Sequence, residues 1–384
     1  MDAAQSAGKP AKKRIKVEKG SMDLSFLILV LVLLAIGLIM LFSASYAYAY
    51  YHDGNSFYYI SRQLLFAIVG VVAMLVVSNI DYHILHRFAI LLLAGTIFLL
   101  IVVLFYHTRG DAKRWIPLVG GLTFQPSEIA KFTIVVVFAH LISVNYDKMR
   151  DPKYGVWPFL SIMGVIALLM IMQPHLSGTI LIVSIGIVMM FVGGTNLKWF
   201  ALGGALLVGC TIVLAFVPGV VPYAMSRVQY WIDPFSSAQG KGYQTIQSLY
   251  AIGSGGLMGV GIGNSRQKHL YLPEPQNDFV FAVVCEELGF IGATIIILIF
   301  VLLIWRGYVI AMRCRDRFGS MLAIGLTTQV GVQTILNIAV VSNTVPNTGI
   351  SLPFFSSGGT ALMMLLAQMG VILSVSRQST MEKE

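Results

Sequence analysis

Long apolar runs separated by short polar segments dominate the pattern along this chain. The runs occupy ten ranges: 24–43, 62–79, 85–106, 128–145, 156–172, 177–193, 198–218, 279–305, 319–343 and 356–375. Because a helix needs about 20 residues to cross the hydrocarbon of a bilayer, each run is close to the length of one crossing. The pattern therefore predicts an all-α polytopic membrane protein with ten transmembrane helices.

One segment between these runs is much longer than the others. Residues 219–278 separate the seventh and eighth predicted helices, and connections of this length are usually functional. Within them, the sequence KGYQTIQSLYAIGSGGLMGVGIG predicts a helix, a glycine turn and a re-entrant or surface-lying segment. We expect a large extracellular loop that covers the outer face as a lid or floor.

The basic residues predict the orientation of the chain. An even number of helices puts both termini on one side of the membrane. Beyond residue 21, the short loops on that side and the C-terminal tail hold eleven Lys and Arg residues, against eight in the longer segments opposite. Short loops rich in Lys and Arg stay in the cytoplasm, so both termini are predicted to be cytoplasmic.

Composition supports the membrane interpretation. The chain is 57% hydrophobic and 11% charged, with a mean hydropathy of +0.80, which excludes a water-soluble domain and a disordered chain. Cys210 and Cys285 lie in apolar runs and Cys314 in a basic loop, so no disulfide framework or metal cluster is indicated. Motifs for nucleotide binding, zinc proteases and serine hydrolases are absent from the sequence.

The first 21 residues differ from the rest of the chain. Their apolar residues do not recur at helix or strand spacing, and they end in Gly20 and Ser21 just before a second Met, Met22. We therefore interpret them as a tag or fusion remnant. A natural basic tail that binds anionic lipid is the alternative. Without them the net charge falls from +9 to +5, so the charge does not indicate a nucleic-acid partner. Residues 22–384 are expected to form one ten-helix membrane domain.

An acidic residue stands where the long loop meets the eighth predicted helix. Asp278, in PEPQNDFVFAVVCEELG, could be a simple helix N-cap, for which Asp is well suited. Its neighbours favour a reactive site instead, because Glu274, Arg266 and Lys268 precede it closely.

An acidic pair follows inside the same predicted helix. Glu286 and Glu287 should lie roughly 12–14 Å further along the helix than Asp278. Charges at that depth are costly, so we expect both side chains to face a polar interior.

A second charged group opens the fourth predicted helix. Glu128 and Lys131, in FQPSEIAKF, are spaced to share a helix face, and an internal ion pair is the plain alternative to a binding role. Lys113 and Arg114 precede them, and Arg62 begins the second predicted helix on the same side. Each could anchor the chain at the interface. Together, several basic groups on one face more plausibly form an anion site.

Two polar breaks complete the candidate chemistry. QPHLSGT, with His175, predicts a tight turn between the fifth and sixth helices, and the turn explains the break without a catalytic role. Residues 343–359, which include Ser356 and Ser357, are rich in hydroxyls, Pro and Gly at the mouth of the last helix. Their hydroxyl and backbone N–H groups could bind phosphate or sugar oxygens, although by themselves they indicate only a broken helix.

Three long motifs make the chain resemble a known family. GYQTIQSLYAIGSGGLMGVGIGNSRQKHLYLPEPQNDFVFAVVCEELGFIG, RWIPLVGGLTFQPSEIAKF and NTGISLPFFSSGGT closely resemble the SEDS family of bacterial cell-wall proteins, the RodA, FtsW and SpoVE type. The resemblance covers essentially everything after residue 22. It implies a peptidoglycan glycosyltransferase of the bacterial cytoplasmic membrane that polymerises lipid II and works with a class B penicillin-binding protein.

The resemblance also implies roles for individual residues. Asp278 matches the essential acidic residue of the family, and His175 stands where the family commonly has Asp. Ser356, Ser357, Gly358 and Gly359 match the motif that opens the last helix. The remaining matches are polar cavity positions: Arg62, Lys113, Arg114, Glu128, Lys131, Glu286 and Glu287.

The expected mechanism follows from these assignments. Asp278 would be the general base for the acceptor hydroxyl, and a divalent cation, Mg²⁺ or Mn²⁺, is a candidate cofactor but not a certain one. The candidate ligands of the substrate and its pyrophosphate are Arg62, Lys113, Arg114, Lys131, Arg266, Lys268, Ser356 and Ser357. A lipid II flippase or transporter, with a path through Glu128, Lys131, Glu286 and Glu287, and a scaffold for the penicillin-binding protein remain alternatives. The sequence leaves open whether the role is in elongation, division or sporulation.

Overall fold

The computed structural model describes residues 20–106, 114–117, 123–205, 230–237, 240 and 242–379. Eight helices in these ranges are long and apolar enough to cross a membrane, and a ninth apolar helix, α7 (Leu176–Val192), has 17 residues. The chain is therefore a multi-pass helical membrane protein. The predicted seventh span, 198–218, is helical up to residue 205, and the rest of it lies outside the described residues, so the count of ten stays a prediction.

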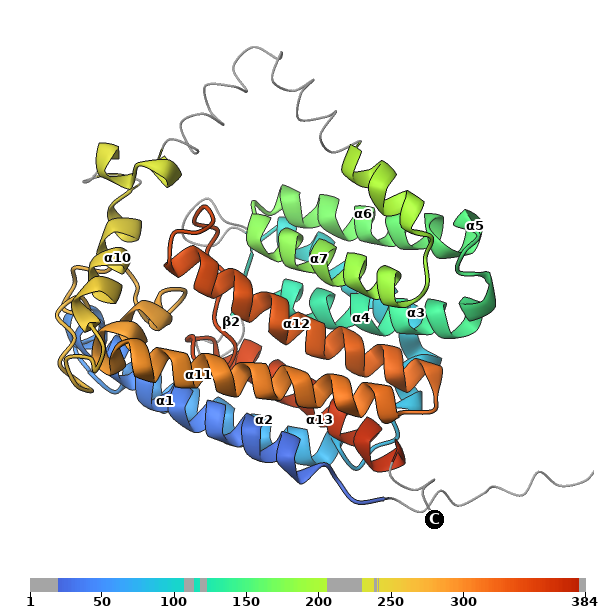
Figure 1. Ribbon diagram of the computed structural model, residues 1–384, viewed down its shortest axis with the longest axis horizontal. Helices are drawn as coiled ribbons and strands as arrows, with labels where there is room; N and C mark the ends of the chain where they lie inside the picture. The colour runs from blue at the N-terminus through green and yellow to red at the C-terminus, as the bar shows by residue number, and fades with distance from the viewer. Residues whose placement is uncertain are drawn as a thin grey trace, which may run out of the picture.

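The helices pack as one bundle (Figure 1). α12 has neighbours on several sides, since it contacts α11, α13, α4 and α7, and α1 runs beside α11. α2 packs most closely against α13, and α3 and α6 adjoin α4. The elements are α1 (Leu24–Asp53), α2 (Tyr58–Val77), α3 (His83–Leu104), α4 (Pro126–Asn145), α5 (Pro152–Gly155), α6 (Trp157–Met172), α7, α10 (Tyr243–Gly255), α11 (Val280–Arg313), α12 (Arg317–Val341) and α13 (Gly359–Ser379).

Close packing between α2 and α13 depends on small residues. A Cβ at Gly370 would lie 2.5 Å from the carbonyl oxygen of Met74, so only glycine lets these two backbones approach so closely. Lipid tails are as apolar as the side chains of another helix, so the hydrophobic effect does not drive helices together in a membrane. Close backbone contact of this kind is therefore a main source of helix association there. The pair forms one wall of the bundle.

α1 extends well past its predicted end at residue 43. The Asp23 carboxylate caps its start by accepting from the Phe26 N–H at 3.0 Å, and Gly54 ends it in the left-handed conformation. At about 1.5 Å per residue, its 30 residues span roughly 45 Å, against about 30 Å of hydrocarbon. The last turns of α1, which are rich in Tyr and Ala, therefore extend beyond the apolar layer.

The first and last described segments of the chain lie together at one end of the bundle. The backbone N–H of Asp23 donates to Ser376 Oγ at 3.2 Å, and the Asp23 carboxylate pairs with Arg306 at 2.8 Å. Arg317, which follows a basic connection, pairs with Asp147 at 3.7 Å at the same end. The structure thus brings the start of α1 and the end of α13 together with the basic loops, while the orientation of this end in the membrane stays a prediction.

At the opposite end, the loop folds onto a break in α11. α10 and the glycine turn after it agree with the sequence prediction, whereas residues 219–229 of the predicted loop lie outside the described residues. α11 is broken at Gly289, where φ is 67°, and loop backbone fills the gap: Val260 N–H donates to the Glu286 carbonyl and Phe290 N–H to that of Gly256. The predicted eighth span is thus two helical pieces.

A short hairpin also lies at this end and was not predicted. Residues Ile116–Pro117 (β1) pair antiparallel with Thr123–Phe124 (β2). Two residues per strand are too few to show an alternating pattern in the sequence. The hairpin matters because it begins two residues after Arg114 and leads into α4.

Candidate active site at the end opposite the termini

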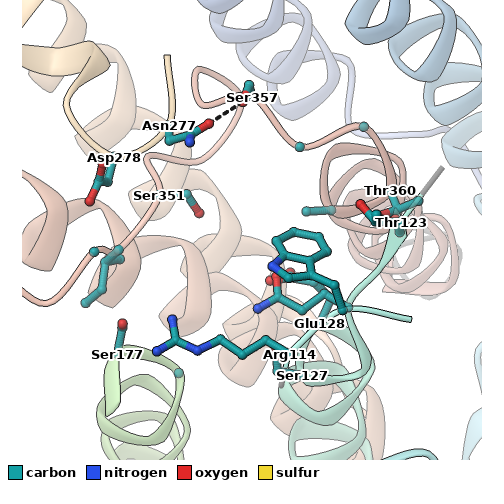
Figure 2. Close-up of a pocket in the computed structure, with 18 of the residues that line it drawn as sticks. Arg114, Thr123, Ser127, Glu128, Ser177, Asn277, Asp278, Ser351, Ser357 and Thr360 are labelled. Atoms are coloured by element: carbon teal, nitrogen blue, oxygen red, sulfur yellow. Dashed lines mark hydrogen bonds between the residues drawn. The ribbon is translucent and has the colours of Figure 1, made fainter. Parts of the chain in front are cut away.

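A cavity of about 560 Å³ opens at the end of the bundle opposite the termini (Figure 2). Its walls are the first turns of α2, α4, α7 and α13, the segment before the hairpin, and the end of the loop that leads into α11. Six of the site residues predicted from the sequence line it: Arg62, Arg114, Glu128, Lys131, Asp278 and Ser357. Lys113 lies outside the described residues.

Asp278 is half-buried and lines the cavity just before the start of α11. The N-cap of that helix is Phe279 and has no side-chain cap, so the N-cap explanation for Asp278 is wrong. Burial, together with the nearby charge of Glu274 and against the lowering effect of a backbone hydrogen bond, raises the pKa of Asp278 to about 6. Its backbone carbonyl accepts from Asn337 Nδ2 at 2.8 Å, which fixes the segment on α12. Asp278 is thus a poised acid–base group in a cavity.

The cations of the cavity come from other elements. Figure 2 shows the Arg114 side chain reaching toward Ser177 at the start of α7, across the cavity from Asp278. Arg114 Nε donates to the Gln173 carbonyl at 3.3 Å, and its terminal nitrogen donates to the Pro174 carbonyl. These contacts hold the guanidinium against the cavity wall.

Lys131 and Glu128 form the predicted ion pair, with 2.7 Å between Nζ and Oε2. The Lys131 side chain is only 6% exposed and also lies 3.5 Å from Gln333 Oε1 on α12. The pair therefore helps to hold α4 against α12. Because both side chains line the cavity as well, a bound anion can also contact Lys131.

The two serines of the last motif have different surroundings. Ser357 lines the cavity and donates from Oγ to Asn277 Oδ1 at 2.6 Å. Ser356 is buried instead, and its hydroxyl accepts from the Leu352 N–H at 2.7 Å. Ser356 therefore stabilises the turn before α13, and we exclude it from the proposed site.

Gln63 links α2 to that same turn. Its Nε2 donates to the Ser356 carbonyl at 3.1 Å, and its Oε1 accepts from the Gly358 N–H at 3.2 Å. Arg62 is exposed at the cavity, and its guanidinium carbon lies 4.3 Å from the centre of the Tyr58 ring. The hydrogen bonds of Gln63 thus hold the start of α2 and the start of α13 together at the rim of the cavity.

His175 caps the start of α7, as expected for a structural turn. Its Nδ1 accepts from the Gly178 N–H at 3.3 Å, and its Nε2 lies 2.8 Å from Gln125 Nε2. Burial, together with the charges of Arg114 and Lys131, lowers the pKa of His175 to about 3. His175 lines the cavity as a neutral ring, so it adds no charge to the site.

The acidic pair of α11 lies elsewhere, which corrects the expectation of one continuous polar cavity. Glu286 and Glu287 are each 1% exposed and do not line the cavity. Glu287 pairs with Lys268 at 2.9 Å and accepts from Ser43 Oγ at 2.7 Å. Glu286 accepts from the Ser265 hydroxyl.

The basic residues near this pair are also outside the cavity. Lys268 is 3% exposed and fully engaged with Glu287 and Ser43, while Arg266 is exposed and donates its backbone N–H to Glu286 Oε1 at 2.9 Å. The group that we call the loop anchor comprises Ser43, Ser265, Lys268, Glu286 and Glu287. It ties the loop to α1 and α11, so we exclude Arg266 and Lys268 from the proposed substrate site.

The described residues do not form a protein metal site. No group of three His, Cys, Asp or Glu side chains converges in the ranges that the structure describes. We therefore derive no step of chemistry through a metal. Cys285 is buried, the sulfur of Cys314 lies 3.9 Å from the Tyr82 hydroxyl, and Cys210 lies outside the described residues.

The sequence did not single out several residues that line the cavity. Tyr58, Tyr59, Gln125, Asn277 and Gln333 come from four separate segments. Asn277 could have been found, because it adjoins Asp278 in a polar run. Tyr58 and Tyr59 read as ordinary aromatic residues at a membrane interface, and only the fold brings them to the cavity.

Comparison with known proteins decides the family. The model of the FtsW, RodA and SpoVE family, described as "Cell cycle protein", matches residues 23–381. The chain belongs to this family. The FtsW/RodA/SpoVE proteins are multi-pass proteins of the cytoplasmic membrane, in agreement with the helices described above.

Relatives in the family cover most of the chain. Stage V sporulation protein E of Bacillus subtilis (strain 168) is 42% identical over 332 residues, which are 86% of this chain and 90% of that protein. The probable peptidoglycan glycosyltransferase FtsW of Geobacter sp. (strain M18) is 36% identical over 329 residues, 85% of this chain and 88% of that one.

Two solved structures share the fold. A chain from work on structural coordination of polymerization and crosslinking by a peptidoglycan synthase complex has a TM-score of 0.78 and 27% identity, covering 94% of this chain and 99% of that chain. The rod shape determining protein RodA of Thermus thermophilus has a TM-score of 0.67 and 24% identity, covering 93% and 97%. The second likeness concerns the fold alone.

Proposed function

We propose that the chain is a peptidoglycan glycosyltransferase that polymerises lipid II on the outer face of the bacterial cytoplasmic membrane. The observation that carries this proposal is the cavity that Asp278, with a pKa raised to about 6, shares with Arg114 and Lys131. A base opposite cations suits an acceptor hydroxyl that attacks a sugar diphosphate. The name of the Geobacter relative, a probable peptidoglycan glycosyltransferase, supports the same reaction.

Asp278 acts as the general base. With a pKa of about 6 it is ionised at neutral pH, and it is a stronger base than an ordinary aspartate. It takes the proton from the 4-hydroxyl of the acceptor N-acetylglucosamine as that oxygen attacks C1 of the donor sugar. The bond from C1 to the pyrophosphate oxygen breaks, and the polyprenyl pyrophosphate leaves. One displacement of this kind inverts the configuration at C1.

The pyrophosphate binds at the cationic wall. Arg114 donates hydrogen bonds to the carbonyls of Gln173 and Pro174, and Lys131 lies on α4. The start of α7 adds the positive end of a helix dipole beside Ser177. Because these groups are fixed before the reaction, they stabilise the charge of the leaving group without reorganisation.

A second cavity provides a site for the polyprenyl chain. It has a volume of about 280 Å³ and an almost entirely apolar lining, and it lies between α2, α3, α4 and α13. Val77, Leu85, Phe132 and Met364 are among its lining residues. Since α2, α4 and α13 also form walls of the first cavity, a chain bound here can carry its pyrophosphate to the cations. Binding energy from the chain then positions the sugars.

The contacts do not favour the transport alternative. A path through Glu128, Lys131, Glu286 and Glu287 would need these groups to line one space. Instead Lys131 pairs with Glu128, and Glu287 with Lys268 in the loop anchor. Because Glu286 and Glu287 are enclosed in the loop anchor and do not line the cavity, the four residues do not form one polar path for a headgroup.

We propose a class B penicillin-binding protein as the partner, because a structural relative comes from a peptidoglycan synthase complex. The test combines the detergent-solubilised chain with this partner and purified lipid II, and compares the native chain with Asp278→Asn. The matched control is Asp233→Asn, an exposed loop aspartate whose carboxylate accepts from the Phe235 N–H and can be replaced by Asn.

Glycan ladders from the native chain and from Asp233→Asn, and none from Asp278→Asn, are the expected result. Equal polymer from all three would remove Asp278 from the chemistry. If the native chain with its partner made no polymer, the proposed enzyme function would fail.

A further inference from the structure

A group of aromatic and polar side chains lines the cavity beside Asp278. Tyr58 and Tyr59 open α2, and their rings meet edge to face with centroids 5.2 Å apart. Glu274 and Asn277 come from the loop, and Asn277 Nδ2 donates to Glu274 Oε2 at 2.8 Å. All four line the cavity, and we call this group the tyrosine shelf.

The shelf is a built element of the fold. Tyr59 also packs edge to face on Tyr48 of α1, with centroids 6.1 Å apart, and Tyr48 stacks on His52 at 4.1 Å. Glu274 is close enough to Tyr48 and Tyr59 for its charge to act on both phenols. Asn277 accepts from Ser357 at 2.6 Å, so the start of α13 supports the shelf as well.

The shelf differs from an aromatic belt at the membrane interface. Belt tyrosines project outward, as Tyr50 and Tyr51 do here with 63% and 75% of their surface exposed. Tyr58 and Tyr59 are only partly exposed and face the cavity instead. Their position therefore calls for a ligand inside the cavity.

The polar groups of the shelf suit a neutral, hydroxyl-rich ligand. A carboxylate and an amide can accept from and donate to hydroxyl and N-acetyl groups, and tyrosine rings offer flat apolar faces to the C–H faces of a sugar. The four shelf side chains include no cation, and the guanidinium of Arg62 lies against the Tyr58 ring, with its carbon 4.3 Å from the ring centre. Arg114 lies across the cavity from Asn277 and Ser357 in Figure 2, so the pyrophosphate and the sugar have separate walls.

We propose that the tyrosine shelf binds the acceptor sugar and presents its hydroxyl to Asp278. This inference rests on the proposed glycosyltransferase function. Asn277 adjoins Asp278 in the chain, so a sugar on the shelf has its hydroxyl next to the base, while the donor pyrophosphate occupies the wall of Arg114 and Lys131. Tyr58 and Tyr59 thus distinguish a saccharide from a bare polyprenyl pyrophosphate.

The test measures binding by the full chain carrying Asp278→Asn, in which turnover is stopped. The two probes are lipid II and undecaprenyl pyrophosphate, which lacks the sugars. In this background we expect Tyr59→Ala to weaken lipid II binding about ten-fold, as loss of one aromatic stacking contact would. Binding of undecaprenyl pyrophosphate should stay within two-fold, whereas Arg114→Ala should weaken both probes. Tyr59→Phe, which keeps the ring, should recover most of the affinity that Tyr59→Ala loses.

Tyr51→Ala is the matched control, because Tyr51 is exposed and does not line the cavity. Equal weakening of both probes by Tyr59→Ala would mean a merely structural role and would overturn the proposal, as would no change in either. If lipid II binding depends on Tyr59 but the native chain with its partner makes no glycan, the shelf stands as a saccharide site and the enzyme function fails.

Discussion

The loop anchor and the cavity around Asp278 both combine carboxylates with a lysine, but they differ in access. In the anchor, the Lys268 side chain is 3% exposed and that of Glu287 is fully buried, and every charge has a partner within the protein. In the cavity, the side chain of Glu128 is 15% exposed, and Arg62 and Glu274 are open to solvent.

This difference separates structural from functional charges. A buried pair with all its hydrogen bonds made is costly to break but offers nothing to a ligand. Charges that line an open space keep unused hydrogen-bonding capacity, and burial on one side is enough to shift the pKa of Asp278. The anchor should therefore respond to mutation through stability, and the cavity through activity. Four measurements test this division, beginning with the largest expected effect.

Asp278→Asn should abolish most polymerisation with little effect on folding. Losing the general base is expected to reduce the rate about 10²–10⁴-fold. Asn keeps the shape of the side chain, so the thermal unfolding midpoint in detergent should stay near that of the native chain. A large fall in the midpoint would show that Asp278 stabilises the fold and would contradict its assignment as the general base.

Glu287→Ala should have the opposite profile. Removing one partner leaves Lys268 buried without its anion, and breaking such a pair costs about 3–5 kcal/mol. We expect a lower thermal unfolding midpoint, measured in detergent. Replacing both residues, with Lys268→Met and Glu287→Leu, should recover most of the stability, because no unpaired charge then remains. Failure of this rescue would contradict a purely structural anchor.

Arg114→Ala should lower the rate of polymerisation about 10²-fold, as removal of one preorganised charge donor does. Its hydrogen bonds go to two carbonyls in the turn before α7, so only a small loss of stability is expected. Steady-state rates at saturating lipid II measure the effect. As a matched comparison, Arg266→Ala should leave the rate unchanged, because Arg266 is exposed outside the cavity.

The smallest effect concerns pH. Polymerisation should fall as the pH drops through about 6, because Asp278 must be ionised to act as base. The charge of Glu274 raises the pKa of Asp278, so Glu274→Gln should shift this acidic limb to lower pH by a few tenths of a unit. A shift to higher pH would contradict the assignment.

The same group has a consequence for stability with a defined sign. The pKa of Asp278 is higher in the folded chain than its ordinary value, so the native state holds this proton more tightly than the unfolded state. The stabilisation is fully present below the ordinary pKa and is lost as the pH rises through about 6. Asp278→Asn removes this dependence.

Local patterns decided much of the fold in advance. Nine of the ten predicted spans coincide with helices in the described residues, because a 20-residue apolar run must form internal backbone hydrogen bonds in lipid whatever surrounds it. The glycine turn after α10 was also predicted, because a run of glycines favours backbone with positive φ. Gly256, Gly259, Gly261 and Gly263 have positive φ in the structure. The extension of α1 and the break at Gly289 were not predicted, because α1 continues beyond its apolar run and the break at Gly289 is filled by backbone of a distant loop.

The sequence alone determined that this is a helical membrane protein and which segments carry its charges, because apolar length, residue type and spacing are local properties. It identified Asp278 and the Glu128–Lys131 pair from their neighbours in the chain. Only the tertiary structure decided which charges share a space: it brings Arg114, Lys131 and the tyrosine shelf to Asp278, and closes Glu286 and Glu287 into the loop anchor. Whether a charge binds a ligand or stabilises the fold depends on what lies across from it, and that partner comes from a distant part of the chain.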